Sequence, residues 1–325
     1  MNRPGLAAVL AAMLACPLGC SGEGSSPTPD GLDFSALMAP DDTAGALPPR
    51  QPYRARDGAR LHYRHYEADS PVWLILIHGS ATDSVYLQRF ANAVAGAGAA
   101  QVVTPDLRGH GPSPGRRGDI AYIDQLEDDL ADLVGHLRSW GGAGRVIVGG
   151  HSSGGGLALR FAAGEHGDLA SGYLLLAPYL GHDAPTARPS GNGWARPNLW
   201  RIVPIAAANA LGIRWFNGVD VLYFDLPARY RTGRETLAYS YRLMTGFGPA
   251  DYRSAFATLD APALLLAGAE DEAFRPERYA PAITPHNAAV DIELLDGVSH
   301  LGLVMRDATA KRAVRWLDAL RQPVD

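Results

Sequence analysis

Residues 145–154 read RVIVGGHSSG, a short apolar run that leads directly into a Gly-x-Ser-x-Gly pattern. The apolar half predicts a buried strand, and the residues after it predict a helix. In such a strand–turn–helix setting the pattern places Ser152, preceded by His151, at a sharp turn where Gly150 and Gly154 leave room for neighbouring backbone. The start of the helix would present free N–H groups beside the serine. We interpret Ser152 as a nucleophile; the alternative is a glycine-rich turn with an incidental serine.

A second turn follows another apolar run, VWLILI at residues 72–77. It reads His78-Gly79-Ser80 and comes at the end of a predicted buried strand. If Ser152 attacks a carbonyl, the oxyanion needs two N–H donors, and the candidates are the amides of Ser80 and Ser153. Taken without Ser152, the same residues suit a plain turn at a strand end.

An acid and a histidine complete the chemistry later in the chain. Asp271 follows the apolar run 263–267, and His300 follows the run 290–295. A nucleophilic serine needs a histidine to take its proton and an acid to fix the tautomer of that histidine. The order Ser152, Asp271, His300 is the order of nucleophile-elbow hydrolases and differs from the orders of chymotrypsin and subtilisin.

Other residues compete for these two roles. Glu270 and Glu272 flank the acid, but Asp271 stands at the better distance from its strand. His286 is the other histidine after the acid, and it lies between a predicted helix and a predicted strand. No two histidines have a convincing metal-ligand arrangement and no HExxH motif is present, so we expect no metal and no cofactor.

Strand and helix patterns alternate from residue 51 onward, except over 178–257. The predicted strands are 52–56, 60–66, 72–77, 101–104, 145–149, 172–177, 263–267 and 290–295. The predicted helices are 85–97, 123–140, 153–164, 276–283 and 304–321. This alternation predicts an α/β fold with a mostly parallel, doubly wound sheet formed by 51–177 and 258–325. The aromatic stretch 178–257, with helical-looking runs near 199–213 and 235–244, is predicted to be a helical cap insertion, the alternative being a separate helical domain.

Composition excludes several classes of protein. The 325 residues carry a net charge of −5, with 29 basic and 34 acidic side chains, so nucleic acid is not an expected partner. The single lysine, Lys311, follows Ala310 and cannot form the Gly-Lys of a Walker phosphate loop. Both cysteines, Cys16 and Cys20, lie near the N-terminus, which excludes a cysteine nucleophile or a Cys-ligated zinc in the rest of the chain.

The N-terminus has the pattern of an export signal. A positive residue and an apolar run of about ten residues precede Cys20. We predict a signal peptide of lipoprotein type over 1–20, with Cys20 lipidated and Cys16 as a second candidate, followed by a flexible linker over 21–50. The protein would then be anchored to a bacterial membrane. The alternative is an ordinary signal peptide and a secreted or periplasmic protein.

These motifs, together with residues 106–113 (DLRGHGPS), carry a family resemblance. Residues 51–321 resemble the α/β-hydrolase superfamily, and look most like its monoacylglycerol lipase/lysophospholipase branch, often labelled serine aminopeptidase-like. The resemblance implies a serine hydrolase that cleaves carboxylic esters, with monoacyl lipids as one substrate class. An amidase, a peptidase or an acyltransferase on the same triad is the alternative, and a non-catalytic binding lipoprotein is a further one.

Overall fold

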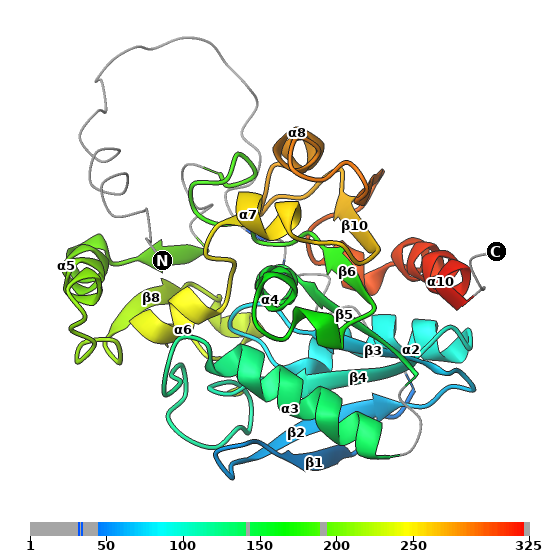
Figure 1. Cartoon of the computed structure of the whole chain (residues 1–325), viewed down its shortest axis with the longest axis horizontal. Coiled ribbons are helices and arrows are strands. Elements are labelled where there is room, and N and C mark those ends of the chain that lie inside the picture. The colour runs from blue at the N-terminus through cyan, green and yellow to red at the C-terminus, as the bar shows by residue number, and fades with distance from the viewer. Residues whose placement is uncertain (1–31, 33, 35–44, 141–143, 189–193, 322–325) are drawn as a thin grey trace.

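The computed structural model describes Leu32, Phe34 and residues 45–140, 144–188 and 194–321. Its centre is an eight-stranded sheet of order β1-β2-β4-β3-β5-β6-β10-β11 (Figure 1). β1 pairs antiparallel with β2 and β2 antiparallel with β4, whereas the other neighbours are parallel, which confirms the mostly parallel sheet. The strands are β1 Arg50–Arg54, β2 Arg60–Tyr66, β3 Val72–Ile77, β4 Gln101–Asp106, β5 Arg145–His151, β6 Gly172–Leu176, β10 Ala263–Gly268 and β11 Asp291–Leu295.

The central strands are buried along almost their whole length. Every residue of β3, β6 and β10 is buried, and β5 exposes only its first residue. Parallel strands covered on both faces need continuous apolar runs, which is why these segments were recognisable in the sequence.

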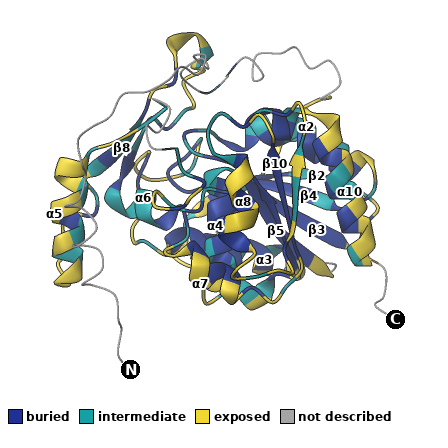
Figure 2. Ribbon diagram, turned by 90° about the horizontal axis from the view of Figure 1, so that it is seen from above, coloured by how far each residue is buried: buried dark blue, intermediate teal, exposed yellow. Residues whose placement is uncertain are grey.

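Helices cover both faces of the sheet. On one face α2 packs against α10, and on the other α4 packs against α3 and α7 (Tyr252–Ala257), as Figures 1 and 2 show. The short helix α9 also contacts α2. The helices of this core are α2 Gln88–Gly96, α3 Gln125–Ser139, α4 Ser153–Ala163, α8 Tyr279–Ile283, α9 Gly302–Met305 and α10 Asp307–Arg321. The predicted helix 304–321 is therefore two helices, because Arg306 is extended (φ −103°, ψ 135°).

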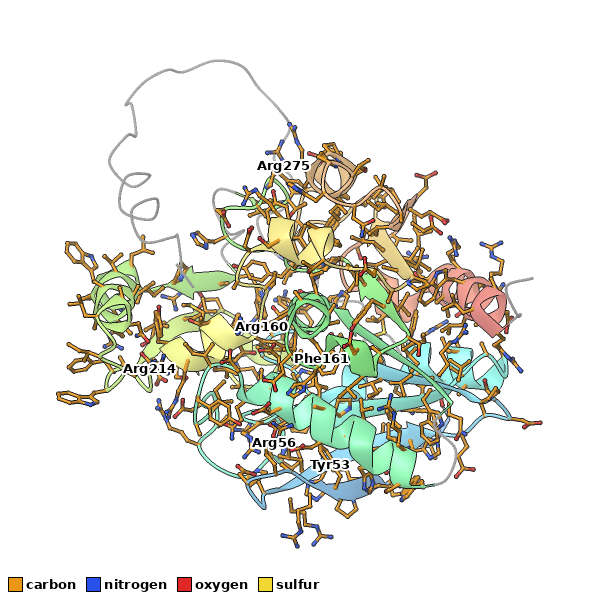
Figure 3. The ribbon with its side chains drawn as sticks, in the orientation of Figure 1. Tyr53, Arg56, Arg160, Phe161, Arg214 and Arg275 are labelled. Carbon is orange, nitrogen blue, oxygen red and sulfur yellow. The ribbon has the colours of Figure 1, made fainter. Side chains whose placement is uncertain are left out.

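Two arginines tie the loops and helices beside the site together. Arg108, in the segment 106–113, makes two hydrogen bonds of 2.8 and 2.7 Å to the buried Asp129 of α3. Arg160, next to Phe161 on α4 (Figure 3), pairs with Glu127. The same arginine also reaches backbone carbonyls at the end of α6 (Tyr241–Gly246). The position of α4 is thus fixed from both sides.

The insertion between β6 and β10 contains strands as well as helices. It comprises β7 Ala195–Pro197, α5 Leu199–Ala210, β8 Asp220–Phe224, β9 Ala238–Ser240, α6, and α7 Tyr252–Ala257. The three strands form an antiparallel sheet of order β7-β8-β9. The helix predicted near 235–244 begins as a strand because Ala238 and Tyr239 pair with β8. A purely helical cap is therefore corrected to a mixed one.

The N-terminal region differs from the predicted linker at its described residues. β1 begins at Arg50, and Leu32 and Phe34 pack against the folded body. The predicted signal peptide 1–20, with Cys16 and Cys20, lies outside the described residues. In the described ranges no helix is both long and apolar enough to cross a membrane.

Candidate active site

Ser152 connects β5 to α4 through a single residue of unusual backbone conformation. Its φ is 58° and its ψ is −122°, a combination that costs a non-glycine residue about 1–3 kcal/mol. Three hydrogen bonds hold it: its N–H donates to the carbonyl of Leu176 (2.8 Å), and its carbonyl accepts from the amides of Gly156 (3.1 Å) and Tyr179 (3.0 Å). The turn therefore projects the serine side chain at the carboxyl end of the sheet.

Glycines on both sides of the serine allow this close packing. A Cβ on Gly150 would lie 2.3 Å from the backbone of Gly154. A Cβ on Gly154 would lie 2.4 Å from the carbonyl oxygen of Ile77 and 2.5 Å from that of His78. These contacts are backbone contacts, so no side-chain movement can relieve them. The pattern predicted from the sequence thus has a steric basis in the structure.

His300 and Asp271 meet at the same edge of the sheet. Asp271 follows β10 and His300 follows β11, two parallel neighbours whose carboxyl ends lie together. His300 Nδ1 lies 2.8 Å from Asp271 Oδ2, and both residues are 2% exposed. The other carboxylate oxygen of Asp271 accepts the amides of Ala273 and Phe274, each at 2.8 Å. Because Asp271 accepts at Nδ1, the proton of a neutral His300 ring lies on Nδ1 and the lone pair lies on Nε2.

The charges of this pair reinforce one another. Burial alone would raise the pKa of Asp271, but the charge of His300 and the hydrogen bonds to the carboxylate lower it. Burial alone would lower the pKa of His300, but Asp271 and, to a smaller extent, Glu272 raise it. The pair therefore favours an ionised acid beside a readily protonated imidazole.

His151 links the serine turn to the histidine loop. Its Nε2–H donates to the carbonyl of His300 (3.0 Å), and its Nδ1 accepts from the hydroxyl of Tyr86 (2.9 Å). The same hydroxyl accepts the amide of Gly79 (2.7 Å). Burial and the neighbouring His300 lower the pKa of His151 to about 3, so its ring is neutral and this pattern of donors is fixed.

The predicted oxyanion residues also come together. The hydroxyls of Ser80 and Ser153 are 2.6 Å apart, so the end of β3 and the start of α4 adjoin. The next amide along, that of Ala81, donates to the hydroxyl of Tyr239 in β9 (2.7 Å). His110 of the segment 106–113 contacts this hydroxyl through Nε2, which gives it a structural role at the border of the site.

The competing residues are placed differently from Asp271 and His300. Glu270 and His286 are exposed, and Glu272 accepts the backbone amide of His300 rather than its ring (2.9 Å). Between Ser152 and His300, both described, the structure has no hydrogen bond from hydroxyl to ring.

The sequence patterns did not predict Tyr86 and Tyr239. No motif marks these tyrosines, because their role depends on partners far along the chain.

A metal site is not formed by the described part of the chain. Within these residues, no three or more His, Cys, Asp or Glu side chains are grouped so that they could hold a metal ion.

Comparisons with known proteins found a matching family model and a curated relative. A model of the "Alpha/beta hydrolase family" matches residues 74–313. The curated protein "Lipase LipV" of Mycobacterium tuberculosis is 31% identical over 128 residues, which are 39% of this chain and 45% of LipV, so the match spans less than half of that relative.

Solved structures show the same fold. A soluble variant of monoglyceride lipase from Saccharomyces cerevisiae superposes with a TM-score of 0.65 at 19% identity, over 87% of this chain and 99% of that one. A monoacylglycerol lipase from Paleococcus ferrophilus has a TM-score of 0.61 at 20% identity, over 80% of this chain and 98% of that one.

The close packing at Gly154 can be tested by measuring the stability of a variant that carries a Cβ there. We expect Gly154→Ala to destabilise the fold by at least about 2 kcal/mol, since overpacking costs roughly 1–3 kcal/mol and here backbone must move. Gly135→Ala in α3 is the matched control, because nothing lies within 4 Å of its Cβ position. Alanine there should raise stability by up to about 1 kcal/mol. Urea unfolding of both variants measures the difference, and equal stabilities would contradict the close packing at Gly154.

Proposed function

The chain belongs to the alpha/beta hydrolase family, and on that premise we propose that it is a serine hydrolase that cleaves carboxylic esters. The observation that supports this most is the buried pair of His300 and Asp271, joined through His151 to the strained turn of Ser152. That arrangement supplies a base, an orienting acid and a half-buried nucleophile at the turn.

The proposed reaction has two stages. Ser152 Oγ attacks the ester carbonyl carbon while His300 Nε2 takes the hydroxyl proton. The carbonyl oxygen becomes an oxyanion held by the amides of Ser80 and Ser153. The alcohol leaves with the proton from His300, and an acyl group remains on the serine. In the second stage water attacks the acyl carbonyl carbon while His300 takes its proton. His300 then returns the proton to Ser152 Oγ, which releases the acid and restores the serine.

Asp271 acts through His300 in this scheme. Its Oδ2 lies 2.8 Å from Nδ1 and accepts the Nδ1–H, so the lone pair of Nε2 is available to accept a proton. Its own pKa is lowered, so it stays ionised and stabilises the imidazolium that forms.

An apolar outer face of the cap favours a lipid-like ester as substrate. Trp200 and Trp215 are 92% and 89% exposed, and Leu199 and Leu211 beside them are also exposed. Figure 2 shows α5 at the outer side of the cap, with much of its surface exposed. Residues 198–219 contain no acidic side chain, and Arg214 lies on this side of the molecule (Figure 3). Such a surface suits contact with lipid, and the curated relative LipV is named a lipase. We therefore favour monoacyl lipids.

Removing the nucleophile tests the reaction. We expect Ser152→Ala to lower kcat/KM on short p-nitrophenyl esters by at least about 10³-fold, as loss of a triad member does. Ser80→Ala is the control, because it removes a hydroxyl and keeps the proposed amide donor, and we expect a loss below about tenfold. Retained turnover in Ser152→Ala contradicts the mechanism. Product analysis with an added alcohol, and with amide substrates, separates an esterase from an acyltransferase or an amidase.

The raised pKa of His300 predicts the acid side of the pH profile. The base must be neutral, so kcat/KM should rise with pH through a pKa above the ordinary value of about 6.5. Glu272→Gln removes a negative charge that raises this pKa and keeps an oxygen for the His300 amide, so the profile should move to lower pH.

Glu270→Gln is the matched control for this shift, since Glu270 is exposed and does not contribute to the pKa of His300. A profile that moves equally in both variants, or to higher pH in Glu272→Gln, contradicts the assignment of His300 as the base.

We also propose that residues 1–20 direct export and that Cys20 carries a lipid anchor. The support is the sequence pattern of an apolar run, a cysteine and a polar tether. Expressed in a bacterium grown with labelled palmitate, the protein should incorporate label, and Cys20→Ser should lose the label and leave the membrane fraction. Cys16→Ser is the matched control and should keep both. The opposite result would move the attachment to Cys16, and no label in either protein would indicate an ordinary signal peptide.

A further inference from the structure

One aromatic residue of the N-terminal region is buried between the cap and the core. Phe34 is 8% exposed and forms a small cluster, here called the Phe34 pocket. Its walls are Tyr86 and Leu301 of the core and Trp194, Leu226, Tyr230 and Leu237 of the cap, with Leu32 beside Phe34.

The Phe34 side chain makes close ring contacts in this pocket. Its ring centroid lies 5.0 Å from that of Trp194, at an interplanar angle of 54°. It lies 5.4 Å from that of Tyr230, at 42°. Such tilted pairs at this separation are favourable beyond the area that they bury. The pocket therefore has the size and character to hold an apolar, six-membered ring or a chain of similar width.

The core side of the pocket adjoins the residues of the proposed mechanism. Leu301 follows His300 directly in the chain. Tyr86 bonds both His151 and the amide of Gly79, and a Cβ on Gly79 would lie only 3.3 Å from the Cβ of Ser152. A group attached to a carbonyl at Ser152 therefore has this apolar space next to it.

We propose that the Phe34 pocket is the binding site for the apolar part of the substrate, and that Phe34 is an intramolecular occupant which the substrate displaces. This inference rests on the proposed function. The side chains that pack around Phe34 are aliphatic or aromatic, which suits an acyl chain or an aromatic ring. Some substrates bind only when the pocket is free. Their apparent affinity equals the intrinsic affinity multiplied by the fraction of molecules in which Phe34 lies outside the pocket.

Long and short acyl chains compete differently with Phe34 for the pocket. An octanoyl chain extends beyond the carbonyl into the pocket and competes with Phe34, whereas an acetyl group stays at the carbonyl. The occupant therefore acts on KM for long chains and leaves the chemical step at Ser152 unchanged. A purely structural Phe34, which only fastens the cap, would show no such dependence on chain length.

The test compares full-length wild type with Phe34→Ala on p-nitrophenyl acetate and octanoate. We expect KM for octanoate to fall at least about fivefold, with KM for acetate and both kcat values within about twofold. Phe34→Leu, which fills the pocket less and keeps it apolar, should give an intermediate KM and serves if the alanine variant is unstable. Tyr122→Ala is the matched control, since it removes a 42% exposed aromatic ring outside the pocket, and should change neither KM.

A binding measurement on the Ser152→Ala background separates this inference from the proposed function. Phe34→Ala should tighten the binding of the apolar fluorophore N-phenyl-1-naphthylamine by at least about fivefold. Tighter binding without any ester hydrolysis by wild type would overturn the hydrolase function and retain the pocket. An unchanged or raised KM for octanoate, with unchanged fluorophore affinity, would overturn the occupancy of the pocket by Phe34.

Discussion

The chain turns from β5 into α4 within one residue, Ser152, whose positive φ no ordinary side chain adopts without cost. That turn persists because hydrogen bonds from β6, α4 and the segment after β6 converge on its backbone. The same crowding demands glycine at positions 150 and 154, where any Cβ would meet backbone atoms. The backbone of the buried central strands and of α4 therefore packs closely around Ser152 and holds it in place.

The carboxylate of Asp271 decides which of two equally buried histidines takes up a proton. His151 and His300 lie with ring centroids 4.6 Å apart, so both cannot carry a proton at low cost. His151 has no carboxylate partner, and its pKa falls to about 3. His300 has Asp271, and its pKa rises. One imidazole is thus a neutral hydrogen-bonding link and the other is the group that can take up a proton, although they are neighbours.

Local patterns account for what the sequence predicted well. The apolar runs of β3, β5 and β10 predict buried parallel strands, which the structure confirms. Ser80, Ser152 and Asp271 follow these strands and are the predicted site residues, because strand ends carry the chemistry in such sheets, and their catalytic roles stay a prediction.

Contacts between distant residues account for what the sequence did not predict. Tyr86 and Tyr239 act through their hydroxyls on segments elsewhere in the chain, and the cap sheet depends on pairing of β9 with β8 rather than on helical propensity. Phe34 lies in a region rich in proline and glycine that has no periodic pattern. Its ring nevertheless packs against apolar side chains of the core and the cap.

The place of Phe34 in the chain matters if Cys20 is the point of membrane attachment. Phe34 is fourteen positions after Cys20, and at about 3.5 Å per position this stretch spans at most about 50 Å. The chain from Cys20 to the start of β1 at Arg50 spans at most about 100 Å. With Phe34 seated and Cys20 anchored, the position of Phe34 is confined to the shorter distance from the bilayer. A lipid that displaces Phe34 would therefore both gain the pocket and lengthen the tether, so that substrate binding and the reach of the enzyme over the membrane are governed by one side chain.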